Sequence, residues 1–360
     1  MMKKSIFLMA FCLCLVLSGC SLWMDGSYSV VTPHQAQSDV YDPETVEVES
    51  YTQLDKALLE RVESGRTDFV LYTRTLTAQQ LSGYMEMAKR NAMQDNAIGA
   101  YAVNAITYEI GTNSGRTAIS VKIDYEHGRS EILRIKTVST MEEAQKLITK
   151  ALENCDASVV LRVQQYQNID FTQLIQDHMD SNPQKCMEMP QVSAVSYPQT
   201  GSNRVVELTF TYQTSRDSLR SMQEAVQPIF SSAKLYISTD APALEKYAQL
   251  YAFLMGRDTY TIQTSITPSY SLLSHGVGDS KALAVVYAAM CRQSGLDCQV
   301  ISGTRGGEAW CWNVILMDGI YYHLDLLQCN RMDGFALKNQ EEMNEYVWDY
   351  SAYSSATTGG

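Results

Sequence analysis

Apolar residues occur along the chain with three kinds of spacing. A continuous apolar run covers residues 6–17, and polar residues dominate from 21 to about 49. Beyond residue 50, some stretches carry an apolar residue every three or four positions, as in a half-buried helix, and others alternate as in a strand. This pattern predicts a short leader, a flexible polar tether and a folded α+β protein.

The stretch from Tyr51 to about Thr214 contains one pattern twice. The first copy predicts helix, strand, helix and two strands, in the order 54–62, 69–72, 78–93, 101–110 and 117–125. The second copy predicts the same order at 144–151, 159–161, 171–179, 192–197 and 205–212. A Gly-Thr-Asn-Ser-Gly turn joins the last two strands of the first copy, and a Gly-Ser-Asn turn joins those of the second. Because the order and the turns coincide, we interpret the pattern as two tandem α/β repeats.

A third start follows, with a helix predicted at 218–231 and a strand at 235–237, and a further compact stretch begins at about Thr239. The predicted organisation is a signal peptide (1–19), a tether (20–49), repeat 1 (50–138), repeat 2 (139–237), a C-terminal domain (238–345) and a tail (346–360). The tail ends in Ser, Thr and Gly, which is typical of a disordered end.

The leader has the features of a secretory signal. Lys3 and Lys4 precede an apolar run about half as long as the roughly 20 residues that span a bilayer. The ending Leu17-Ser18-Gly19-Cys20 resembles the bacterial lipobox, which implies cleavage before Cys20 and a diacylglyceryl group on its thiol. Such a lipid would anchor the protein to the cell membrane on its extracytoplasmic face. The alternatives are an uncleaved signal anchor and an ordinary signal peptide followed by a chance cysteine.

The charge of the chain narrows its possible partners. The formal net charge is -12, and loss of Lys3 and Lys4 with the leader would lower it to -14. No basic stripe is present to attract phosphates, so we expect no nucleic-acid partner. An acidic surface also disfavours adsorption to anionic lipid, so membrane attachment requires the anchor at Cys20.

The remaining polar residues indicate no metal or cofactor. Six cysteines lie beyond the leader and Cys20, at 155, 186, 291, 298, 311 and 329, without a CxxC pair or a zinc-type histidine spacing. In an exported protein they are compatible with disulfides and equally with buried thiols. The repeats contain no paired carboxylates or phosphate loop, and His127 and His178 are single, so the repeats are interpreted as a spacer or an interaction module.

The C-terminal stretch contains an ordered set of motifs. The segment Gly276-Val277-Gly278-Asp279-Ser280 leads into a predicted helix through Met290, and a strand at 298–302 is followed by Gly303. Further on come the run Trp-Cys-Trp-Asn-Val at 310–314, an Asp-Gly turn at 318–319, and Tyr-Tyr-His-Leu-Asp at 321–325. This order resembles the core of the transglutaminase-like superfamily, which implies a papain-like transglutaminase-type domain over roughly 239–329.

The resemblance also implies where a catalytic triad would lie. The family's cysteine position is assigned to Gly278, its histidine position to Trp310, and its acid to Asp325. The chemistry needs a thiolate at a helix N-terminus, a histidine that moves the proton and an acid that orients the histidine. Glycine cannot attack a carbonyl and indole cannot take a proton, so the resemblance implies a degenerate, inactive triad.

Neighbouring polar residues are candidates for a relocated site or for the lining of a cleft. Asp279 and Ser280 lie at the predicted helix start, where a serine is also an ordinary capping residue. His323 shares the strand face of Asp325, Asn313 is predicted to be hydrogen-bonding scaffold, and Cys311 points to the opposite face from residue 310.

We therefore expect a non-catalytic, anchored lipoprotein that binds a protein, a peptide or a cell-wall component. One alternative is an active envelope hydrolase or acyl-transfer enzyme with relocated residues, which requires a nucleophile and a base within hydrogen-bond reach. Another is a structural member of an envelope assembly, which predicts an apolar patch on the repeats.

Overall fold

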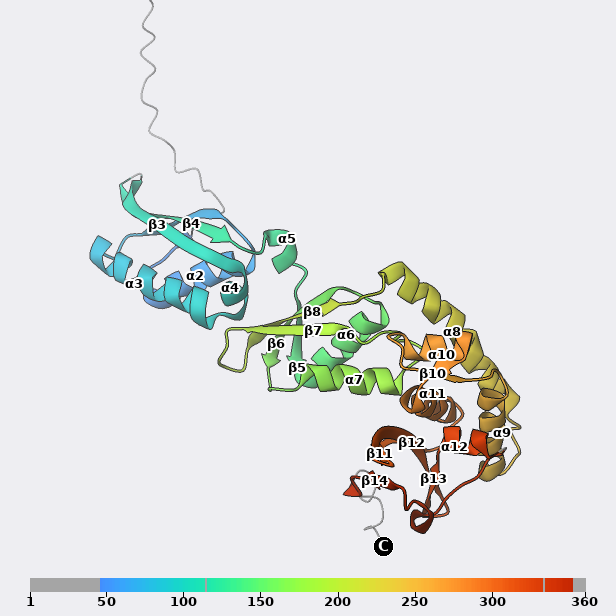
Figure 1. Cartoon of the computed structure of the whole chain (residues 1–360). Helices are drawn as coiled ribbons and strands as arrows, with labels where there is room; N and C mark the ends of the chain where they lie inside the picture. The colour runs from blue at the N-terminus through green and yellow to red at the C-terminus, as the bar shows by residue number, and fades with distance from the viewer. Residues whose placement is uncertain (1–45, 114, 333, 352–360) are drawn as a thin grey trace, which may run out of the picture. The chain divides into compact units, whose positions relative to one another are not determined.

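The structure is a computed structural model that describes residues 46–351, except 114 and 333 (Figure 1). The predicted signal peptide, the lipidation site at Cys20 and most of the predicted tether lie outside the described residues. Within the described ranges, no helix is both long enough and apolar enough to cross a bilayer.

The first sheet has four strands in the order β1-β2-β4-β3. These strands are β1 (Val46–Glu47), β2 (Asp68–Thr73), β3 (Val103–Asn113) and β4 (Arg116–Tyr125), and β1 pairs parallel to β2 while the other pairs are antiparallel. Helices α2 (Tyr51–Glu63) and α3 (Ala78–Arg90) pack their apolar residues against the sheet, and a π-helical turn, η1 (Asn91–Asp95), and α4 (Ala97–Ala102) precede β3. Ser50 caps α2, and Thr77 with Gln80 forms a capping box on α3, so local hydrogen bonds define both helix starts.

The second sheet has the order β5-β6-β8-β7, with the same sequence of pairing directions as the first. Its strands are β5 (Lys136–Thr140), β6 (Ser158–Gln165), β7 (Gln191–Tyr197) and β8 (Arg204–Thr211), and its helices are α6 (Met141–Glu153) and α7 (Phe171–Ser181). The short helix α5 (Arg129–Ile132) precedes β5. The Thr140 hydroxyl caps α6 by accepting a hydrogen bond from the backbone N–H of Glu143, and the Glu143 side chain accepts one from the backbone N–H of Ser139.

The first sheet begins earlier than the sequence indicates. The tether is predicted to run to residue 49, but β1 lies within it and Val48 is fully buried among α2, α3 and the sheet. Only two residues of β1 pair with β2, and the residues around them are polar. The hydrophobic pattern therefore did not predict this short strand. The folded part of the chain therefore starts at Val46 or before.

The C-terminal domain is built around one buried helix. Its helices are α8 (Arg216–Tyr236), α9 (Ala243–Met255), α10 (Pro268–His275), α11 (Ser280–Gln293) and α12 (Leu326–Arg331). Its sheet has the order β13-β12-β11-β14, formed by β11 (Cys298–Arg305), β12 (Glu308–Met317), β13 (Ile320–Leu324) and β14 (Tyr346–Trp348). Two short strands, β9 (Thr261–Ile262) and β10 (Val277–Gly278), pair separately, and a 3-10 turn, η2 (Gln340–Glu342), precedes β14. Every residue of α11 from Ala282 to Cys291 is buried, so α11 is the centre of this domain.

Two boundaries of the C-terminal domain differ from the sequence prediction. The strand predicted at 235–237 is the end of α8, which continues to Tyr236, and Leu219, Val226 and Phe230 of α8 pack into the core of the C-terminal domain. The tail predicted from 346 contains β14, which pairs with β11 and buries Tyr346 and Trp348. Leu235 and Tyr236 are exposed, so their apolar character did not indicate a buried strand, whereas β14 is buried by a strand that is distant in sequence.

Candidate functional site

The N-terminus of α11 carries several predicted site residues. Asp279 is the N-cap, and its carboxylate accepts hydrogen bonds from the Ala282 backbone N–H at 2.8 Å and from the Thr264 hydroxyl at 3.0 Å. Ser280 is the first helical residue, and its Oγ accepts a hydrogen bond of 3.1 Å from the backbone N–H of Cys311 on β12. The start of α11 is thus bonded to the strand that also carries Trp310.

Gly278 lies just before α11, in β10, and does not face the other two triad positions. A β-carbon built on Gly278 would point at the Leu272 side chain, 2.7 Å away, and at Ala282, 3.3 Å away. A side chain at this position would require the Leu272 side chain to shift. Ser280, two residues later, is the residue at the start of α11 that reaches β12.

Trp310 and Asp325, by contrast, are in direct contact. The indole Nε1 of Trp310 donates a hydrogen bond of 2.7 Å to Oδ2 of Asp325. The hydroxyl of Tyr346 donates to the same oxygen, also at 2.7 Å, and the backbone N–H of Gln328 donates to Oδ1 at 3.1 Å. Asp325 is 5% exposed, so three donors stabilise a carboxylate that is almost completely removed from water.

Tyr346 and Arg305 complete this cluster, and the sequence reasoning missed both. Burial and the neighbouring Asp325 raise the pKa of Tyr346 well above its usual range, so the phenol remains a proton donor at neutral pH. The Arg305 guanidinium lies over the rings of Trp310 and Tyr346, at 5.8 and 5.6 Å from their centroids. The alternation in Tyr346-Val347-Trp348 was the one sequence signal that could have placed Tyr346 in a strand.

His323 lies on β13, two residues before Asp325, but does not take part in this cluster. Its Nδ1 accepts a hydrogen bond of 3.0 Å from the indole Nε1 of Trp312, and it packs against Trp348. His323 is 1% exposed, and burial lowers its pKa to about 4. The ring is therefore neutral at pH 7, and its contacts are those of a core residue.

The other candidate residues have structural roles. Asn313 is fully buried, and its Nδ2 donates to the backbone oxygen of Ala284, which ties β12 to α11. Cys311 lies on the other face of β12 from Trp310, beside the Ser302 hydroxyl, and burial raises the pKa of its thiol. A protonated thiol is a poor nucleophile at neutral pH.

Among the described residues, the Ser280 hydroxyl has no imidazole or carboxylate within hydrogen-bond distance, and its one hydrogen bond is to a backbone N–H. Trp310 holds the place beside Asp325, but an indole N–H can only donate. At this position Asp325 therefore contacts a hydrogen-bond donor and not a base.

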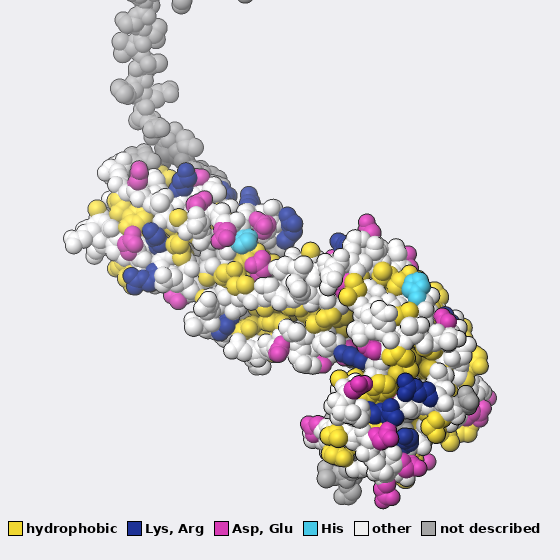
Figure 2. All heavy atoms as spheres, viewed as in Figure 1, with side chains coloured by type: hydrophobic (Ala, Val, Ile, Leu, Met, Phe, Trp, Pro, Cys, Tyr) yellow, Lys and Arg dark blue, Asp and Glu magenta, His cyan; other side chains and the backbone are white. Residues whose placement is uncertain are grey.

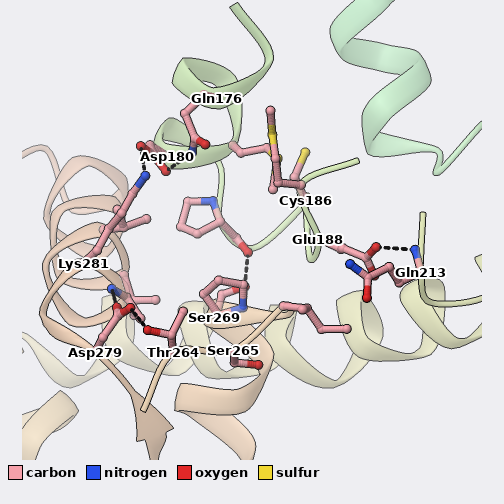
Figure 3. Close-up of a pocket in the computed structure, with 18 residues that line it drawn as sticks. Gln176, Asp180, Cys186, Glu188, Gln213, Thr264, Ser265, Ser269, Asp279 and Lys281 are labelled. Atoms are coloured by element: carbon pink, nitrogen blue, oxygen red, sulfur yellow. Dashed lines mark hydrogen bonds and ion pairs between the residues drawn. The ribbon is translucent and has the colours of Figure 1, made fainter. Parts of the chain in front are cut away.

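A cavity of about 300 Å³ has two walls (Figure 3). One wall is formed by α7 and the loop that follows it, and the other by residues near the start of the C-terminal domain. Its apolar lining comes from both sides and includes Met179, Pro183, Cys186, Met189, Ile266, Pro268, Ala282, Val285 and Val286. Asp180 and Lys281 form an ion pair of 3.1 Å at one end, and Glu188 lies at the other. Of the four charged residues that line the cavity, the sequence motifs include only Asp279, because the lining combines two segments that lie about 100 residues apart in sequence.

Comparison with known families identifies the C-terminal part of the chain. Residues 232–326 match the model of the Transglutaminase-like superfamily. No curated protein matched the chain. This match agrees with the order of motifs, although it starts within α8, before the boundary that the sequence predicts.

Among solved structures, the chain is similar to a transglutaminase (TGase), with 9% identity, a TM-score of 0.24, and coverage of 47% of this chain and 50% of that one. It is similar to a predicted cysteine protease from Cytophaga hutchinsonii, with 11% identity, a TM-score of 0.25, and coverage of 41% and 65%. A predicted protease from Parabacteroides distasonis matches with 8% identity and a TM-score of 0.23, over 72% of this chain and 40% of that one. The chain spans less than two thirds of each of these proteins. Together, the family match and the order of α11, β12 and β13 identify residues 232–326 as a transglutaminase-like domain.

Proposed function

We propose that this protein is a membrane-anchored, extracytoplasmic lipoprotein whose transglutaminase-like domain does not catalyse a reaction and serves as a binding module for a protein, a peptide or a cell-wall component. The observation that carries the proposal is the hydrogen bond from Trp310 to Asp325. At the position where the family has its histidine, this chain has an indole, and an indole cannot accept a proton.

The state of Ser280 supports the same conclusion. A serine at the first position of a helix experiences the helix dipole, but a hydroxyl still needs a base to become a nucleophile. The neutral His323 is engaged with Trp312 in the core, and Asp325 is engaged with three donors. Neither group is available to activate Ser280.

Turnover assays on the full-length chain in detergent test the absence of catalysis. The protein would be incubated with glutamine- and lysine-bearing peptides and with cell-wall fragments, beside a Ser280→Ala variant. We expect no turnover above background and no difference between the two proteins. Turnover that is lost in Ser280→Ala would overturn the proposal and favour an enzyme with relocated residues.

The anchor at Cys20 is the second part of the proposal, supported by the sequence of the leader. Growth of a bacterial host with a labelled fatty acid should label the wild-type protein and a Cys14→Ser variant, because Cys14 is removed with the leader. A Cys20→Ser variant should remain unlabelled. Label on Cys20→Ser, or none on the wild type, would contradict the anchor.

The identical strand orders of the first two sheets support a duplicated, non-catalytic stalk between the anchor and the C-terminal domain. Both sheets begin with a parallel pair and continue with two antiparallel pairs, and both carry two helices that pack on the sheet. On the face shown in Figure 2, acidic and basic side chains are interspersed. We propose that the two repeats hold the binding module away from the membrane.

A further inference from the structure

The cavity between α7 and α11 has an unusual combination of linings. Most of its wall is apolar, yet three carboxylates line it, Asp180, Glu188 and Asp279, with a single cationic side chain, Lys281. The formal charge of the lining is therefore three negative charges less one positive charge, or -2. Such a cavity is complementary to a ligand that is apolar over most of its length and positively charged at one end.

Two of the three carboxylates already have compensating partners. Asp180 pairs with Lys281 at 3.1 Å and also accepts a hydrogen bond of 2.9 Å from Gln176. Asp279 caps α11, so the positive end of the helix dipole and the Thr264 hydroxyl stabilise its charge. The charge of neither residue therefore requires compensation by a ligand.

Glu188 is different, because it is buried and lacks a cationic partner. It is 4% exposed, and its two oxygens accept hydrogen bonds from the backbone N–H groups of Gln213, at 2.5 Å, and Thr214, at 3.1 Å. Among the described residues, no lysine, arginine or histidine lies within ion-pair distance of it. Backbone donors satisfy its hydrogen bonds, and Glu188 lines the wall of the apolar cavity with no cationic side chain beside it among the described residues.

We propose that this cavity binds an apolar chain that ends in a cationic group, with the cation beside Glu188 and the chain along Met179, Val285 and Val286. The proposal rests on the non-catalytic binding function above and gives that function a ligand class. A lysine side chain of a partner peptide and a free alkylamine share this chemistry. The volume of about 300 Å³ is at the lower end of small-molecule sites and fits a ligand of this size.

Isothermal titration of the full-length chain in detergent at pH 7 tests the proposal. The probes are n-pentylamine, which is protonated at this pH, and 1-pentanol, which has a similar shape and no charge. A short peptide with a central lysine and its norleucine counterpart form a second pair, which separates a peptide source from a free amine. We expect the cationic member of at least one pair to bind about tenfold or more tightly than its neutral counterpart.

Two variants link such binding to the cavity. Glu188→Gln removes the carboxyl group and should abolish the preference for the cationic probe, but it also leaves one acceptor oxygen for two backbone N–H groups and thereby affects folding. Gln213→Lys adds a positive charge at an exposed lining side chain and should weaken binding of the cationic probe by about tenfold. Gln79→Lys makes the same charge change at an exposed position on α3, outside the cavity, and should leave binding unchanged.

The outcomes separate this proposal from the proposed function. Equal binding of charged and neutral probes, no binding of any probe, or equal effects of Gln213→Lys and Gln79→Lys would each overturn the assignment of the cavity. None of these results bears on catalysis, which the Ser280→Ala comparison tests. Conversely, Ser280-dependent turnover would overturn the non-catalytic function while the charge preference of the cavity could still be measured.

Discussion

The Tyr346→Phe substitution is the sharpest test of the cluster around Asp325. It deletes one hydroxyl and keeps the ring, so the packing of β14 against Trp312 is retained. The deleted group donates a 2.7 Å hydrogen bond to Asp325 Oδ2, and both residues are about 5% exposed or less. The carboxylate is left with Trp310 on that oxygen and cannot recruit bulk water easily.

The expected cost follows from the type of bond that is lost. A hydrogen bond to a charged group contributes about 1.5–3 kcal/mol, so we expect the free energy of unfolding to fall by about 2 kcal/mol. Tyr322→Phe is the matched control, because it deletes the same atom from β13 and the Tyr322 hydroxyl makes no hydrogen bond among the described residues. Its cost should lie within about 0.5 kcal/mol of zero.

Urea unfolding monitored by tryptophan fluorescence suits this measurement. Three of the four tryptophans of the chain, at 310, 312 and 348, lie in the sheet that contains the cluster, so the signal reports on this domain. If Tyr346→Phe and Tyr322→Phe cost the same, the bond to Asp325 does not stabilise the domain and the description of the cluster is wrong.

A double variant extends the same reasoning. Trp310→Phe with Tyr346→Phe removes both donors from Oδ2 of a buried carboxyl group. Its free energy of unfolding should therefore fall further than that of Tyr346→Phe alone in the same urea assay. Equal unfolding free energies of the two variants would contradict this expectation.

Three further predictions concern individual side chains. Burial lowers the pKa of His323 to about 4, so the stability that the neutral ring contributes is present above pH 6.5 and is lost, by up to about 3 kcal/mol, as pH falls toward 4. Urea unfolding of His323→Gln should therefore depend less on pH than that of the wild type. An unchanged pH dependence would refute the argument. Ser280→Ala should cost about 1 kcal/mol in the same assay, because the Cys311 N–H loses its acceptor, and a cost near zero would show that water replaces it. Among the six described cysteines, iodoacetamide should label Cys311 first, because the other five are buried, and mass spectrometry that found a buried cysteine labelled faster would contradict the packing.

Hydrophobic spacing was sufficient to predict most of the secondary structure. Strands such as 205–212 and helices such as 171–179 agree with β8 and α7 to within a few residues, because each buries one face against its own neighbours along the chain. The motif order at 276–325 was likewise sufficient to indicate the transglutaminase-like domain, because that order is carried by short local runs. The spacing missed β1 and β14, whose burial depends on strands far away in sequence.

The candidate site depended more strongly on tertiary structure. The sequence by itself determined that residue 310 is an indole and residue 325 a carboxylate, and therefore that a proton relay between them is chemically impossible. Only the folded chain decided that Ser280, rather than Gly278, reaches β12, since that choice depends on the direction of a Cα–Cβ bond at a helix start. Only the folded chain also brought Tyr346 to Asp325 and Glu188 to the cavity, because hydrogen bonding and burial join atoms that the sequence separates by 20 to 100 residues.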